Sequence, residues 1–185
     1  MRIGITGTPG TGKKSVGIEL SKLTGLDLIS LSEVAIQRRA GTWRKGEFNV
    51  DVKRLKGKID TYGKIISGHL LPFVVPSKDL DFVAILRCSP LVLKKRYFKR
   101  GYSRLKIKQN LEAELLDLVA VKALEVYGPK KVSEFDTTRT KRPRTIAMKI
   151  FSTVEGKKGR RFGIARWSAM SRGSPEKLYS LTGTN

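Results

Sequence analysis

Cysteine and histidine are almost missing from this chain of 185 residues, in which Cys88 is the only cysteine and His69 the only histidine. One cysteine excludes disulfides within the chain and any metal cluster held by several cysteines. One histidine excludes a zinc site or a mechanism built on paired histidines. A chain without disulfides suits a reducing compartment, so we expect a cytoplasmic protein.

Acidic residues are also scarce, because 16 Asp and Glu face 38 Lys and Arg, and the formal net charge at pH 7 is +22. An excess of this size indicates a polyanionic partner or phosphorylated ligands. No apolar run reaches the roughly 18 residues that a membrane-spanning helix needs, and the first ten residues lack the apolar core of a signal peptide. We therefore expect no association with a membrane.

The composition changes near Asp136. Before it, apolar runs alternate with helical patterns, whereas the segments after it, such as TRTKRPR and GKKGRR, are rich in Gly, Ser and Arg. Residues 139–185 hold 12 Lys and Arg but only two acidic residues. We predict a main fold over residues 1–138 and a basic C-terminal extension over 139–185, with one helix at about 143–153.

The main fold follows an α/β pattern. Helical spacing of apolar residues predicts helices at 13–24, 32–40, 90–100 and 104–127. Short apolar or β-branched runs predict strands at 2–6, 26–31, 64–67, 81–87 and 131–135. Strands that alternate with helices in this way form βαβ units, so we expect an open parallel sheet of about five strands with flanking helices.

A phosphate-binding motif follows the first predicted strand. Its sequence is Gly7-Thr8-Pro9-Gly10-Thr11-Gly12-Lys13-Lys14-Ser15, and it opens the first predicted helix, as a P-loop requires. The glycines allow successive backbone N–H groups to face one phosphate, and the helix adds its N-terminal N–H groups and dipole. Lys13 supplies a cation for the β- and γ-phosphates. The motif predicts ATP binding through the phosphate-facing residues Gly10, Thr11, Gly12, Lys13, Lys14 and Ser15.

Further motifs occur in a fixed order: GHL at 68–70, LRCSP at 86–90, KKRYFKRGYS at 94–103, KIKQNLEAELLDLVAVKALEVYG at 106–128 and FDTT at 135–138. Together with the P-loop they resemble the adenylate kinase isoenzyme 6 family, the archaeal and nuclear kinases linked to maturation of the small ribosomal subunit. The resemblance implies a P-loop nucleoside monophosphate kinase-like fold. It also implies an insert at about 31–56 that binds the monophosphate and a short lid at about 99–109.

The resemblance further implies transfer of the γ-phosphate of ATP to AMP, giving two ADP, with Mg²⁺ as cofactor and with ATPase activity. A protein of the small ribosomal subunit, together with rRNA, would be the partner. Adenylate kinases commonly carry Gly and then Thr after the P-loop lysine, and by resemblance to them Ser15 takes the role of the hydroxyl that binds magnesium. Lys14 stands where other P-loops have the Ser or Thr ligand, and Ser67-Gly68 stand where the family has an acid.

Several site residues are assigned by the same resemblance. Arg100 matches the lid arginine, with Arg96 next in preference and Arg104 third; a solvated basic helix is the alternative for this segment. His69 lies near the phosphates of the family's ligands, although a lone histidine is more often structural. The remaining assignments are Asp136 and Thr137 beside the adenine of ATP, and Arg38 and Arg39, with Trp43 and Arg44 nearby, for AMP.

Two alternatives remain open for the chain as a whole. It is either an active adenylate kinase, or a weakly catalytic assembly factor that ATP switches while a basic surface holds rRNA or a ribosomal protein. Residues 139–185 are either a solvated tail or an RNA-binding segment. In the second case Arg160, Arg161, Arg166 and Arg172 would contact phosphates while Phe162 and Trp167 stack on bases.

Overall fold

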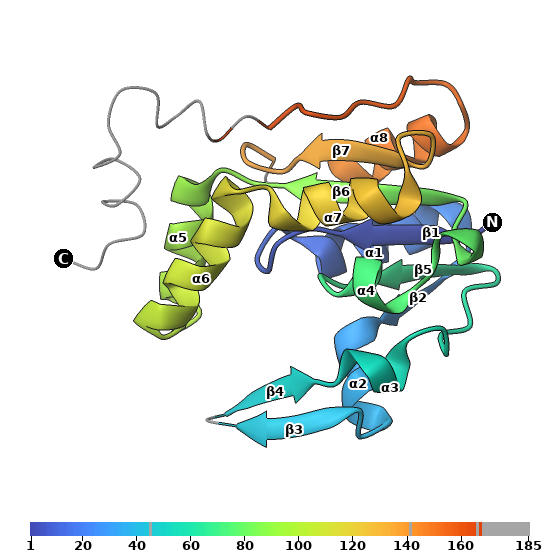
Figure 1. Ribbon diagram of the computed structural model, residues 1–185. Helices are drawn as coiled ribbons and strands as arrows, with labels where there is room; N and C mark the ends of the chain where they lie inside the picture. Colours follow the sequence, from blue (N-terminus) through green and yellow to red (C-terminus); the bar gives the residue numbers. More distant parts are fainter. Residues whose placement is uncertain (45, 141, 166, 168–185) are drawn as a thin grey trace.

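The fold is built around a five-stranded parallel sheet with the strand order β2-β5-β1-β6-β7 (Figure 1), which confirms the expected sheet. The computed structural model describes residues 1–44, 46–140, 142–165 and 167. β6 is buried along its whole length, as the apolar run at 81–87 predicts. The strands are β1 (Ile3–Thr6), β2 (Asp27–Ser30), β5 (Lys64–Ser67), β6 (Phe82–Arg87) and β7 (Val132–Asp136).

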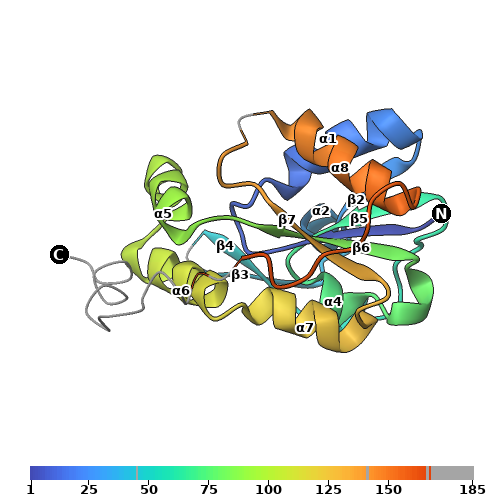
Figure 2. The ribbon, with the colours of Figure 1, turned by 90° about the horizontal axis from the view of Figure 1, so that it is seen from above.

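Helices cover both faces of this sheet (Figure 2). On one face lie α1 (Lys13–Thr24) and α8 (Pro143–Val154), and on the other lie α4 (Leu71–Val74) and α7 (Leu118–Tyr127). Alternate residues of each strand point to opposite faces, so the sheet separates two hydrophobic cores. The core under α1 and α8 consists of Ile3, Ile5, Val16, Leu20, Ile65, Phe82, Ala84, Leu86, Phe135, Ile146, Ala147 and Ile150.

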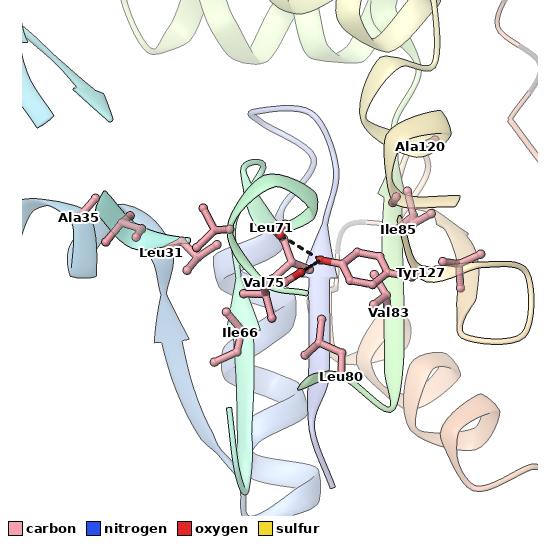
Figure 3. Packing of buried hydrophobic residues seen from close by; sticks show 14 of the residues in the cluster. Leu31, Ala35, Ile66, Leu71, Val75, Leu80, Val83, Ile85, Ala120 and Tyr127 are labelled. Atoms are coloured by element: carbon pink, nitrogen blue, oxygen red, sulfur yellow. Dashed lines mark hydrogen bonds between the residues drawn. The ribbon is translucent and has the colours of Figure 1, made fainter. Parts of the chain in front are cut away.

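The core on the opposite face joins α4 to α7 (Figure 3). The Tyr127 hydroxyl donates to the carbonyl oxygens of Leu71 and Val75, at 2.9 Å each. This buried hydroxyl therefore has acceptors among otherwise apolar side chains, and its ring packs beside Val83 and Ile85 of β6.

The helix expected at about 143–153 is α8, and it is part of the main fold. Ile146, Ala147 and Ile150 are fully buried against α1 and the sheet, because their spacing places them on one helical face. A division after residue 138 would cut through this core. Residues 143–154 therefore belong to the main fold. They are not part of a separate basic extension beginning at 139, which the composition predicts.

Two parts of the chain project from the sheet on the side where the strands end (Figure 1). The first is the insert, with α2 (Leu31–Gln37), the antiparallel hairpin of β3 (Gly41–Arg44) and β4 (Glu47–Val50), and α3 (Val52–Leu55). The hairpin was not expected from the sequence. The second is the pair α5 (Pro90–Lys99) and α6 (Arg104–Leu115).

The single helix predicted over 104–127 is wrong, because α6 ends at Leu115 and α7 begins at Leu118. Asp117 between them has φ 55°, in the left-handed region that interrupts a right-handed helix but that Asp tolerates better than most residues. Its carboxylate forms an ion pair with the buried guanidinium of Arg87, which stabilises the break. Within the described part of the chain, no helix combines the length and apolar character needed to span a membrane.

Candidate nucleotide site

The phosphate loop joins the central strand β1 to α1, at the edge where the parallel strands end, which is where ligands bind to open α/β sheets. Two glycines are required by close contacts. A Cβ on Gly7 would lie 2.3 Å from the carbonyl oxygen of Leu86, and one on Gly10 would lie 2.7 Å from the ring of Tyr97. The first turn of α1 carries no acidic residue, so its N–H groups and dipole remain suited to an anion.

α5 holds the backbone of this loop. The Tyr97 hydroxyl donates to the carbonyl of Pro9, and Arg96 Nη1 donates to the carbonyl of Gly10 at 2.8 Å. Arg96, expected to contact the phosphates, thus already has a partner in the loop itself. Tyr97 is fully buried and was missed by the sequence analysis, although its spacing of four residues from Leu93, which places both on one face of α5, was available as a signal.

Lys13 is the cation of the site. Its Nζ donates to the carbonyls of Gly7 and Thr8, at 2.7 and 3.0 Å. Burial lowers the pKa of Lys13 to about 7; the carboxylate of Glu114 opposes this shift and the charge of Arg100 adds to it. Negative phosphates beside the ammonium would raise this pKa again, so a triphosphate favours the charged form that it needs.

The loop after β7 and the start of α8 complete a hollow of about 220 Å³ beside the phosphate loop. Thr137 is buried there, and its hydroxyl donates to the carbonyls of Thr11 and Arg87, at 3.1 and 2.9 Å. Asp136 is exposed and accepts from the N–H of Thr138, so it closes a turn. The hollow is lined by Gly10, Thr11, Gly12, Ser15, Val16, Arg96, Arg100, Thr137, Thr140, Pro143 and Ile146.

Arg100 lies at the edge of this hollow, with an exposed side chain one residue beyond the end of α5. The structure therefore brings Arg100, Arg96 and Thr137 together around the phosphate loop. Arg104, the third arginine considered, is the exposed first residue of α6 and does not line the hollow. Pro143 and Ile146 were not expected in a site, because the composition after residue 138 predicts an extension rather than a wall of the hollow.

The insert contains a second hollow, of about 420 Å³, beside the β3–β4 hairpin. Arg44 and Arg54 bring positive charge to it, although Arg54 pairs with Asp51 at 3.3 Å and donates to the carbonyl of Arg39 at 3.2 Å. Arg38 and Arg39, expected to bind AMP, are not among its lining residues; Arg38 Nη1 donates to the carbonyl of Lys58 at 2.9 Å. The hollow is lined by Gly41, Thr42, Arg44, Asn49, Val50, Asp51 and Arg54.

His69 follows β5 and lies near Lys13. The residue keeps exposed surface, yet enough protein surrounds the ring to disfavour its charged form. This desolvation, together with the positive charges of Lys13 and Lys106, lowers the pKa of His69 to about 4. The imidazole is thus neutral at pH 7, and it can donate or accept one hydrogen bond but adds no positive charge to the site.

This pKa predicts the titration of the only histidine. In an NMR titration the ring signals of His69 should shift near pH 4 and stay constant from pH 5.5 to 8, whereas the unfolded chain should titrate near pH 6.5. Between these two values only the unfolded chain takes up the proton, so stability should fall as the pH is lowered through this window. Replacing Lys106 by Gln should raise the pKa of His69. A titration of the folded protein at pH 6.5 would contradict the prediction.

The residues that would handle magnesium are few. Ser15 offers an exposed hydroxyl at the mouth of the hollow, and Lys14 pairs with Glu33 of α2, with Nζ 2.8 Å from the carboxylate. No group of three or more Asp, Glu, His or Cys among the described residues is arranged to hold a metal ion. Mg²⁺ keeps several waters and needs only one or two protein ligands when phosphates hold it. These residues fit a magnesium ion that arrives with ATP.

Glu114 of α6 lies beneath the phosphate loop and is only 2% exposed. It accepts hydrogen bonds from the Thr8 hydroxyl at 2.6 Å, from Arg87 Nε at 3.0 Å and from the backbone N–H of Cys88 at 3.1 Å. A charged residue in an amphipathic helix normally faces water, so the burial of Glu114 could not be predicted from its helical pattern.

Comparison with known protein sequences identifies relatives of this chain. Residues 3–117 match a protein family described as "AAA domain". A protein of Thermococcus gammatolerans named "Putative adenylate kinase" is 37% identical over 172 residues, which cover 91% of this chain and 93% of that protein. A protein of the same name from Methanocaldococcus jannaschii is 32% identical, with 91% and 93% covered. The chain belongs to the family of these proteins named "Putative adenylate kinase".

As a member of this family, the chain is a nucleotide kinase with a phosphate-binding loop. Solved structures share its fold. Shikimate kinase from Acinetobacter baumannii in complex with shikimate has a TM-score of 0.60 at 19% identity, with 85% of this chain and 94% of that chain covered. The YorR protein of Bacillus subtilis in complex with phosphorylated GDP has a TM-score of 0.58 at 18% identity, with 86% and 99% covered.

Proposed function

We propose that the protein transfers the γ-phosphoryl group of ATP to AMP, forming two molecules of ADP, and hydrolyses ATP when no acceptor is present. The observation that carries this proposal is a phosphate loop with its lysine, together with a separate hollow in the insert that Arg44 and Arg54 line. The insert also reaches the α5–α6 pair, because Glu47 of the hairpin pairs with Lys106 of α6 at 2.9 Å. The name of the relatives supports AMP as the acceptor.

In this reaction the bond between the γ-phosphorus and the oxygen that bridges it to the β-phosphate breaks. A new bond forms from a phosphate oxygen of AMP to that phosphorus. The protein acts by positioning and by stabilising charge. The loop N–H groups would hold the phosphates, Lys13 would turn from the carbonyls of Gly7 and Thr8 to the transferred group, and Arg100 would approach it from the edge of the hollow.

Magnesium bound to ATP would neutralise charge on the phosphates. Ser15 is the residue that would contribute to holding it, and Arg44 of the insert would hold the phosphate of AMP, with Arg54 beside it in its ion pair with Asp51. Arg38 remains bound to the carbonyl of Lys58, so we place it in the support of the insert rather than at the acceptor.

The deciding experiment measures ADP formation from ATP with AMP, GMP, CMP, UMP or shikimate, or with no acceptor. With AMP, the rate should rise well above the rate without acceptor, and two ADP should form for each AMP consumed. A rate that AMP leaves unchanged would overturn the kinase proposal and leave an ATPase. A larger rise with another acceptor would overturn only the choice of AMP.

Replacing Arg100 by Ala should lower the AMP-dependent kcat about 10- to 100-fold, because a charge-assisted contact to the transferred group is worth about 1.5–3 kcal/mol. The Kd of ATP should change much less, since Arg100 lies at the edge of the hollow and is not part of the loop. Lys95, an exposed residue of α5, is the matched control, and its replacement by Ala should leave both values unchanged. A loss of ATP binding with normal kcat would show that Arg100 acts on the ground state.

A role in maturation of the small ribosomal subunit is the second candidate, and the net charge of +22 is the observation that favours it. The sequence predicts that Trp167 stacks on an RNA base. In the structure its indole N–H donates to Glu114 at 3.0 Å instead. Arg166 and Arg172 lie outside the described residues. Binding of small-subunit rRNA and its proteins at several salt concentrations tests the role, and an affinity no higher than for unrelated RNA would exclude it.

A further inference from the structure

The chain returns along the outer edge of β7 after α8 (Figure 1), as a strap made of residues 160–165 and Trp167. The N–H of Glu134 donates to the carbonyl of Arg161 at 2.7 Å, and the N–H of Arg161 donates to the Ser133 hydroxyl at 3.0 Å. The strap thus satisfies backbone groups at the edge of the sheet that otherwise have no neighbouring strand.

Two further contacts fix the strap. The N–H of Ile164 donates to the buried carboxylate of Glu134 at 2.9 Å, and Ala165 is 4% exposed. The indole Nε1–H of Trp167 then donates to Glu114 Oε1 at 3.0 Å. The end of the strap therefore contacts a carboxylate that lies beneath the phosphate loop.

Glu114 also contacts the phosphate loop. Its other oxygen, Oε2, accepts from the hydroxyl of Thr8, whose side chain is completely buried. The carbonyl of Thr8 accepts from Lys13 Nζ at 3.0 Å and from the N–H of Thr11 at 3.3 Å. Thr8 is therefore the point where the strap, the catalytic lysine and the fold of the loop are connected.

We propose that the strap is part of the nucleotide site and that Trp167 is a positioning residue, which holds the phosphate loop in its binding shape through Glu114 and Thr8. The inference rests on the loop as the binding site for ATP, but not on AMP as the acceptor. Loop N–H groups must already point at the phosphates when ATP arrives, since any reordering is subtracted from the binding free energy. Oε1 of Glu114 accepts from Trp167, Arg87 and Cys88, so loss of the indole N–H removes one of three donors and leaves the carboxylate less tightly held against Thr8.

The first test is a double-mutant cycle on the Kd of ATP, measured by calorimetry. Trp167→Phe keeps an aromatic ring but removes the pyrrole part of the indole with its N–H, and it should weaken ATP binding about 5-fold, the value of one hydrogen bond. In a Thr8→Val background, which breaks the link to the loop, the same change should have an effect below about 2-fold. Equal effects in both backgrounds would show that Trp167 supports the fold without acting on the loop, and would overturn the proposal.

Phe162→Leu is the matched control, because Phe162 lies on the same strap with 42% of its surface exposed. This variant should bind ATP like the wild type. A 5-fold loss here would mean that any change in the strap weakens binding, which would overturn the specific role of Trp167. None of these measurements includes the acceptor, so failure of the AMP proposal would leave their result intact.

The second test uses the wild-type chain and does not depend on the folding of a variant. If the docked strap strengthens ATP binding, ATP must stabilise the docked strap by the same factor. Hydrogen exchange at the amides of Arg161 and Ile164 should therefore slow about 5-fold when a non-hydrolysable ATP analogue saturates the site. Exchange at these amides that the analogue leaves unchanged would overturn the proposal.

Discussion

Replacing Lys13 by Ala should lower ADP formation from ATP by about 10³-fold or more, because the variant lacks the loop ammonium that would contact the β- and γ-phosphates. Among the described residues that line the hollow, Arg96 already donates to the carbonyl of Gly10 and Arg100 lies at the edge. Neither side chain therefore substitutes for the ammonium. The comparison of initial rates with and without AMP measures this loss.

The same variant should keep the fold. Burial lowers the pKa of Lys13 to about 7, so the charged lysine is not a source of stability in the free protein. The melting temperature should stay within about 3 °C of the wild-type value, a change of no more than about 1 kcal/mol. Lys22→Ala, in the same helix but with an exposed side chain paired to Glu19, should leave the rate unchanged. Wild-type turnover in Lys13→Ala would refute the assignment of the loop.

The sheet and the phosphate loop could be predicted because their signals are local. The run DFVAILR becomes β6, and the loop motif carries its own glycines and lysine. The β3–β4 hairpin was missed because it lies away from the main sheet and its strands have only four residues each, too few for the alternation of Phe48 and Val50 with polar residues to stand out. Only Phe48 and Val50 of the hairpin pack against the core.

The electrostatic support of the site could not be predicted for a different reason. Glu114 belongs to a stretch that shows ordinary helical spacing, and its partners come from other elements. Its ion pair with Arg87 joins residues 27 positions apart, and its bond to Thr8 spans 106 positions. The sequence carries no signal for such a pairing. Trp167 illustrates the same limit. The basic and aromatic composition of the segment around it predicts stacking on a base, whereas its indole donates to Glu114.

Arg87 is the centre of a buried ionic cluster, and its side chain is 3% exposed. It donates to Glu114 at 3.0 Å, to Glu134 at 2.7 Å and to Asp117. Burial disfavours its charge, but the three carboxylates outweigh this effect and raise the pKa of Arg87. The cluster joins β6 and β7 to the break between α6 and α7, so it connects the sheet to the helix that carries Glu114.

Replacing Arg87 by Met should lower the free energy of unfolding by about 3–5 kcal/mol, because Glu114 and Glu134 remain buried without a positive partner. Urea denaturation at pH 7 measures the loss. Adding Glu134→Gln to this variant should restore part of it, since one unpaired charge is removed. The deficit should also shrink as the pH falls from 7 to 5, because a carboxylate without a partner has a raised pKa and the folded state then takes up protons. An unchanged urea midpoint would mean that these carboxylates are balanced without Arg87, and it would remove the electrostatic basis for the support of Thr8.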